Sequence, residues 1–126
     1  MKYLIGGLMF AVGVINFFPI VGVYSKETLT RLYGIEVAGP DLEILLRHRA
    51  VLFGLIGGLI FYSVWRPQWQ WPVIVIGLAS MVSFIALAFA VGGYGPGVDK
   101  IIAADVVGSL GLLVVIGLKL YAEPRV

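Results

Sequence analysis

Ionisable side chains that can hold anions or move protons gather in one short stretch of the chain, at Glu43, Arg47, His48 and Arg49. Arginine holds carboxylate, phosphate and carbonyl groups through its N–H fork, and histidine can transfer a proton near neutral pH. If a helix begins near Asp41, Arg49 lies about 12 Å along it, inside an apolar run. Ionisable groups at that depth cost several kcal/mol unless they are paired or hydrated, so this stretch is a candidate functional site.

A carboxylate in a different apolar run, Asp105, is the second candidate. The run that holds it is expected to enter from the same side as the arginine stretch, so we expect similar depths. Asn16, Ser80 and Ser83 can add neutral hydrogen bonds. We therefore predict a polar pocket that binds a ligand through Asn16, Glu43, Arg47, His48, Arg49 and Asp105. His48 and Asp105 are the candidates for acid–base catalysis.

Helical angles assign directions to the two arginines. Arg47 falls on the same narrow face as the small side chains, which predicts that it points toward the other helices. That face contains Ala50, Gly54, Gly57, Gly58 and Phe61. Glu43 precedes Arg47 by four residues, the favourable order for a pair on a helix. Arg49 lies about 200° round and is expected to face another helix, a surface segment or a lipid phosphate.

A structural interpretation stands beside each functional one. Arg47 and Asp105 could form an ion pair that fixes the register of two helices. Arg49 could extend to lipid headgroups while its stem stays in the apolar region. His48 could be a structural hydrogen-bonding group, and Asn16 could join two helices by hydrogen bonds. The residues alone leave these alternatives open.

The composition determines which elements must position these groups. Of the 126 residues, 60% are hydrophobic and 13% are charged. A soluble domain has about 45–50% apolar and about 25% charged residues, and a chain this small cannot bury such an excess. Four apolar runs, at about 4–23, 45–65, 72–92 and 101–121, each have the length that an α-helix needs to cross a bilayer. We predict an all-α, four-helix membrane bundle in one domain, 1–126.

The ends of the runs carry helix signals. The first run is interpreted as a retained helix, because Lys2 is its only leading charge and no A-x-A site follows. The connection at about 25–40 is predicted to be a short amphipathic helix on the membrane surface, capped by Ser25 and stopped by Gly34. Asp41 is the expected N-cap of the second run, and Pro72 suits the first turn of the third.

Four spans place both termini on one side, and basic residues then indicate the orientation. The terminal side has Lys2, Arg66, Lys119 and Arg125. The other side has Lys26, Arg31 and Lys100 once Arg47 and Arg49 are placed inside the bundle. Because cytoplasmic loops carry the excess of Lys and Arg, this favours cytoplasmic termini.

Part of the sequence resembles a known family. The runs 31–35 (RLYGI), 47–54 (RHRAVLFG) and the pair Ala104-Asp105 resemble small bacterial four-span proteins of the DoxX-like and DUF4345-like kind. The resemblance implies a four-span fold in the bacterial inner membrane and transfers no activity. Similar chains carry the label phosphopantetheine adenylyltransferase; this sequence has no nucleotide-binding motif and no room for a soluble α/β domain.

Several chemistries are excluded by the residue inventory. With one histidine and no cysteine, the chain cannot build an ordinary zinc or haem site, so no metal is predicted; the sequence does not identify a cofactor. The net charge of +2 does not support nucleic-acid binding. We predict binding of a small amphipathic or anionic ligand of the lipid, quinone or isoprenoid class. The alternatives are an accessory subunit of a membrane complex and a small homo-oligomeric transporter.

Overall fold

The computed structural model describes residues 1–122, which form helices joined by short connections and contain no β-strand. The elements in chain order are α1 (Lys2–Phe17), the 3-10 helix η1 (Phe18–Val23), α2 (Lys26–Tyr33), α3 (Pro40–Trp65), the 3-10 helix η2 (Pro67–Trp69), α4 (Gln70–Val91) and α5 (Pro96–Ala122). Four helical stretches are long and apolar enough to cross a membrane, which confirms the predicted all-α class and the four apolar spans. Arg125, used above to judge orientation, lies outside the described residues.

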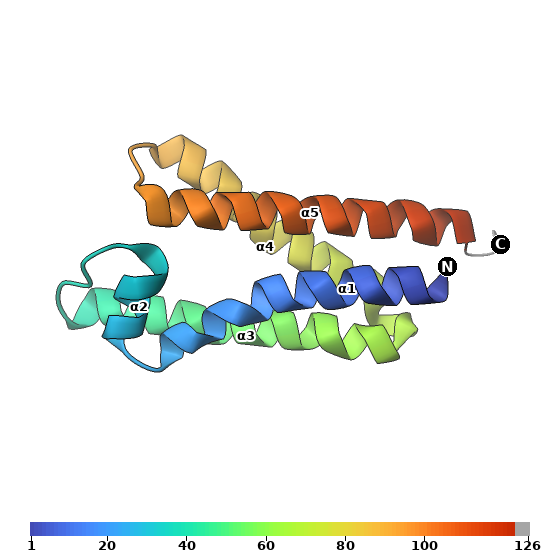
Figure 1. Cartoon of the computed structure of the whole chain (residues 1–126), viewed down its shortest axis with the longest axis horizontal. Coiled ribbons are helices and arrows are strands. Elements are labelled where there is room, and N and C mark those ends of the chain that lie inside the picture. The colour runs from blue at the N-terminus through green and yellow to red at the C-terminus, as the bar shows by residue number, and fades with distance from the viewer. Residues whose placement is uncertain (123–126) are drawn as a thin grey trace.

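The four long helices contact one another in pairs. α1 packs on α3 and on α5, and α4 runs obliquely to contact both α3 and α5 (Figure 1). The N-terminus and the end of α5 lie at one end of the molecule, whereas α2 and the connection between α4 and α5 lie at the other (Figure 1). The two ends of the described chain therefore lie at the same end of the molecule, as expected for four long helices that alternate in direction.

Three helix boundaries differ from the predicted ones, and prolines account for them. The first run is not one helix, because α1 ends at Phe17 and Pro19 stands in the 3-10 helix that follows. Proline has no N–H for the hydrogen bond of a continued α-helix. α3 begins at Pro40 with Gly39 as its N-cap, so the prediction of Asp41 as N-cap is wrong. α5 begins at Pro96, a residue suited to the first helical position.

The short helix α2 has the caps that the sequence predicts. The side-chain oxygen of Ser25 accepts a hydrogen bond from the Thr28 N–H at 3.2 Å. Gly34 ends the helix with φ 64°, a left-handed conformation that glycine adopts without steric cost. Leu29 and Tyr33 of α2 are buried against the rest of the chain. The position of α2 on a membrane surface remains a prediction.

The small residues of α3 form its contact with α1, as predicted. The Cβ position of Gly57 lies 2.6 Å from the backbone nitrogen of Phe17, so the two main chains meet with no room for a side chain. The Phe61 ring of α3 lies against Gly13 of α1, with ring carbon atoms 2.7 Å from the position that a Cβ atom would take at Gly13. Gly58 has no neighbour within 4 Å of its Cβ position and is not part of this contact. The close approach fixes the register of α1 on α3.

Candidate functional site

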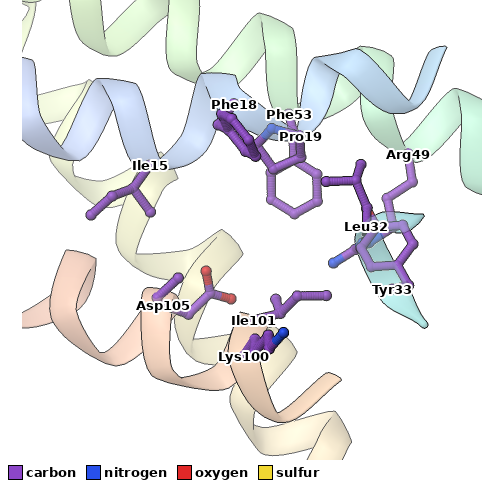
Figure 2. Close-up of a pocket in the computed structure, with 11 residues that line it drawn as sticks. Ile15, Phe18, Pro19, Leu32, Tyr33, Arg49, Phe53, Lys100, Ile101 and Asp105 are labelled. Atoms are coloured by element: carbon purple, nitrogen blue, oxygen red, sulfur yellow. Dashed lines mark hydrogen bonds between the residues drawn. The ribbon is translucent and has the colours of Figure 1, made fainter. Parts of the chain in front are cut away.

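A cavity of about 250 Å³ lies where η1 and α2 meet α3 and α5. Most of its wall is apolar, with Ile15, Phe18, Pro19, Leu32, Phe53 and Ile101 among the lining residues. Four polar or charged side chains also line it, namely Tyr33, Arg49, Lys100 and Asp105 (Figure 2). The cavity thus combines a mostly apolar wall with a few polar and charged side chains, the usual composition of a small-molecule site.

α2 lies over this cavity, and its contacts with α3 and α5 determine its position. At the C-terminal end of α2, the backbone carbonyl of Tyr33 lies against Gly97 of α5 and occupies the place that a Cβ atom would take there. The two helices are therefore in contact through their main chains. Tyr33 is only 5% exposed, and its hydroxyl reaches toward α3. Tyr33 therefore fixes α2 over the cavity through two contacts, its carbonyl with α5 and its hydroxyl with α3.

Arg49 is the positively charged group of the cavity on α3. Its Nη1 donates a hydrogen bond to the Tyr33 hydroxyl at 2.8 Å. Its guanidinium carbon lies 5.3, 4.5 and 4.9 Å from the ring centres of Tyr33, Phe53 and Phe84. Aromatic faces attract a cation, so these rings stabilise the charge away from water. The second terminal nitrogen, Nη2, is buried and has no hydrogen-bond partner.

Asp105 is the acidic group of the same cavity. It is 4% exposed, and its Oδ2 is buried with no hydrogen-bond partner. Asp105 is the tenth residue of α5, and Arg49 is the tenth residue of α3 (105 − 95 and 49 − 39). Both helices begin at the same end of the molecule, so the two groups lie at similar distances from that end. Figure 2 shows the carboxylate and the guanidinium pointing into the cavity from opposite sides.

Arg47 does not take the predicted position beside Asp105. Its Nη1 donates to Glu43 Oε2 at 3.0 Å, and its Nε donates to the backbone carbonyl of Val23 at 3.0 Å. The Glu43–Arg47 pair is confirmed, but the Arg47–Asp105 ion pair is wrong. The physical reason is the end of η1, whose last carbonyl lies within reach of Arg47 and accepts its N–H. Both partners stay partly exposed, with 41% and 31% of their side-chain surface accessible.

Two other predicted residues lie away from the cavity. His48 is exposed and does not line it, so the geometry does not bring the predicted acid–base pair of His48 and Asp105 together there. Asn16 is 1% exposed, and its Nδ2 donates to the Val12 carbonyl at 3.0 Å and contacts Met81 Sδ at 3.7 Å. Asn16 therefore joins α1 to α4 inside the helix packing, which agrees with the structural alternative for this residue.

The aromatic rings around Arg49 were not among the predicted site residues. These rings come from three helices, with Tyr33 in α2, Phe53 in α3 and Phe84 in α4. Arg49 itself was expected to face a helix or a surface segment, and it meets both α2 and α4. An arginine within an apolar run with several aromatic residues is the only signal that could have suggested a cation held by rings.

A second buried charge lies at the opposite end of the helices. Lys119 is 5% exposed, and its Nζ donates to Gln70 Oε1 at 2.8 Å. Gln70 Nε2 in turn donates to the backbone carbonyl of Ser63 at 3.0 Å. The Lys119 Nζ also lies 5.5 Å from the centre of the Trp71 ring. These contacts join α5 to α4 and, through Gln70, to α3.

Comparisons of the chain with protein-family models, with curated proteins and with solved structures found no match. Within residues 1–122, no three His, Cys, Asp or Glu side chains gather in a way that could hold a metal ion.

Proposed function

We propose that the chain is an integral membrane protein whose four long helices form a bundle in the bilayer. The support is the outward surface of these helices, which carries large apolar side chains that the fold leaves uncovered. Leu55, Val75 and Leu113 are 60%, 63% and 53% exposed, one on each of three helices. Burying such side chains is worth about 1.5–3 kcal/mol each, and the hydrocarbon of a bilayer supplies that environment.

We further propose that the cavity binds the polar head of a small amphipathic molecule. The observation that carries this proposal is that Arg49 and Asp105 face one cavity, each with an unpaired buried atom. A buried polar group without a partner costs about 1–3 kcal/mol, so a head that accepts from the arginine and donates to the carboxylate relieves both.

The size and charge of the cavity narrow the class of molecule. A volume of about 250 Å³ holds a compact head group and a few carbon atoms, but no whole lipid. Arg49 and Lys100 outnumber Asp105 among the charged lining groups, which favours a carbonyl or anionic head. Lipids, quinones and isoprenoids with such heads fit this description, with the apolar chain leaving the cavity toward the bilayer.

Any acid–base role falls on Asp105, because His48 lies outside the cavity. We also propose a bacterial inner-membrane location with cytoplasmic termini, on the basis of the DoxX-like resemblance and the distribution of basic residues. A reporter fused to the C-terminus gives a cytoplasmic signal if this orientation is right, and a periplasmic signal reverses it.

Native mass spectrometry of the purified full chain tests the ligand proposal. We expect a bound amphipathic molecule in the unaltered protein and in the control His48→Ala, which leaves the cavity untouched. Arg49→Ala and Asp105→Asn should each lower the bound fraction at least tenfold, equivalent to about 1.4 kcal/mol or more. If no molecule stays bound, or if Arg49→Ala retains as much as the unaltered protein, the cavity is not a binding site.

A further inference from the structure

Three buried oxygen atoms without hydrogen-bond partners occur on α1 and α5, and two of them lie outside the cavity lining. They are Asn16 Oδ1, Asp105 Oδ2 and Ser109 Oγ. The three residues are 1%, 4% and 8% exposed. All three atoms can act as ligands through their lone pairs. Leaving each of them unpaired costs free energy, so each of these atoms needs a physical explanation.

Two of these oxygen atoms belong to one face of α5. Asp105 and Ser109 are separated by one helical turn, and residues at that spacing have Cβ atoms about 5–6 Å apart. Gly108 lies between them in the sequence and carries no side chain. The helix therefore presents a carboxylate and a hydroxyl on adjacent turns, and the side chain of Met81 lies against the glycine between them.

The packing of α1 places Asn16 opposite this face. The Cβ position of Gly108 lies 3.9 Å from Ile15, and that of Gly111 lies 3.0 Å from Val12. These contacts define an antiparallel register in which each step forward on α1 is a step back on α5. In this register Asn16 lies level with the turn between residues 105 and 109.

The orientation of the Asn16 amide follows from its hydrogen bonds. Its nitrogen donates to the Val12 carbonyl, which only a donor can satisfy, so the other end of the amide is the oxygen. The same nitrogen contacts Met81 Sδ, and that sulfur lies 2.6 Å from the Cβ position of Gly108. Asn16 and the middle of the α5 face thus touch one shared side chain. The amide oxygen is left as the acceptor.

We infer that Asp105, Asn16 and Ser109 bind a monovalent cation, with Na⁺ as the best fit. A carboxylate, an amide oxygen and a hydroxyl are hard oxygen ligands, which alkali and alkaline-earth cations prefer over nitrogen or sulfur. Asp105 is the only charged group among the three ligands, and Arg49 and Lys100 line the cavity that it borders, so a monovalent ion adds less positive charge there than a divalent one. A divalent ion would leave an excess positive charge close to Arg49, which lines the same cavity as Asp105.

This inference does not depend on a ligand in the cavity, although Asp105 borders both sites. The full chain in detergent provides the test through its melting temperature in NaCl, LiCl, KCl or choline chloride at constant ionic strength. We expect a saturable rise of roughly 5 °C with Na⁺ and none with choline. A response to choline equal to that to Na⁺ would overturn the inference, because choline is too large to reach the buried oxygen atoms.

Substitutions then locate the effect. Ser109→Ala removes one ligand without adding bulk and should raise the Na⁺ concentration at half-effect about tenfold. Asp105→Asn removes the only charged ligand and should abolish the Na⁺ response. Ser83→Ala is the matched control, because Ser83 is exposed and its hydroxyl bonds to the Ser80 carbonyl of its own helix. If Ser109→Ala behaves as Ser83→Ala does, with an unchanged Na⁺ midpoint, the three oxygen atoms do not bind the ion.

Discussion

The hydrogen bond between Arg49 and Tyr33 links α2 to α3, and its removal should be measurable. Tyr33→Phe deletes the oxygen that accepts from Nη1 at 2.8 Å and keeps the ring 5.3 Å from the guanidinium carbon. The cation–ring attraction therefore persists, and only the hydrogen bond is lost. A hydrogen bond to a charged group contributes about 1.5–3 kcal/mol. We expect a loss of about 2 kcal/mol, or about 30-fold in the unfolding equilibrium.

A double-mutant cycle separates this bond from other effects of the substitution. In an Arg49→Met background the tyrosine hydroxyl has lost its donor, so Tyr33→Phe should cost little, and the coupling energy should be about 2 kcal/mol. Equilibrium unfolding in mixed detergent, followed by circular dichroism, measures all four proteins. Tyr94→Phe is the control, because Tyr94 lies in the exposed connection before α5. A Tyr33→Phe cost below about 0.5 kcal/mol with no coupling would refute this account of α2.

Two further substitutions test the helix packing. Gly57→Ala puts a methyl group against the Phe17 backbone and should cost about 1–3 kcal/mol in thermal melting, whereas Gly58→Ala, with open space around it, should be neutral or stabilising. Equal effects of the two would contradict the close contact of α1 and α3. Gln70→Leu removes the amide that accepts from Lys119 and should cost about 1–3 kcal/mol in chemical unfolding. An unchanged stability would show that this buried contact contributes nothing.

The features that the sequence predicted well are those that depend on local chemistry. Apolar runs of about 20 residues predicted four long helices, because the length and composition of a run are properties of that run alone. The caps of α2 were equally local, since Ser25 and Gly34 act within a few residues. The beginning of α5 at Pro96 was missed because the preceding glycines gave the whole segment the composition of a loop.

The direction of the arginines could not be predicted, because it depends on segments distant in the sequence. Helical angles placed Arg47 correctly on the small-residue face of α3. At its level, however, the opposing segment is the end of η1, and the Val23 carbonyl holds the guanidinium near the surface. Arg49 meets Tyr33, which precedes it by 16 residues, and Phe84, which follows on another helix. No pattern within α3 contains these contacts.

The contact between Gly97 and the Tyr33 carbonyl has a consequence for engineering. Because α5 and α2 meet there through main-chain atoms, the separation of the two elements is set by backbone geometry, and position 97 accepts no larger residue while α2 stays in place. Substitutions at wall positions such as Leu32 or Ile101 can therefore change the shape of the cavity while the separation of α2 and α5 is retained. The cavity is accordingly a scaffold whose lining can be redesigned one side chain at a time.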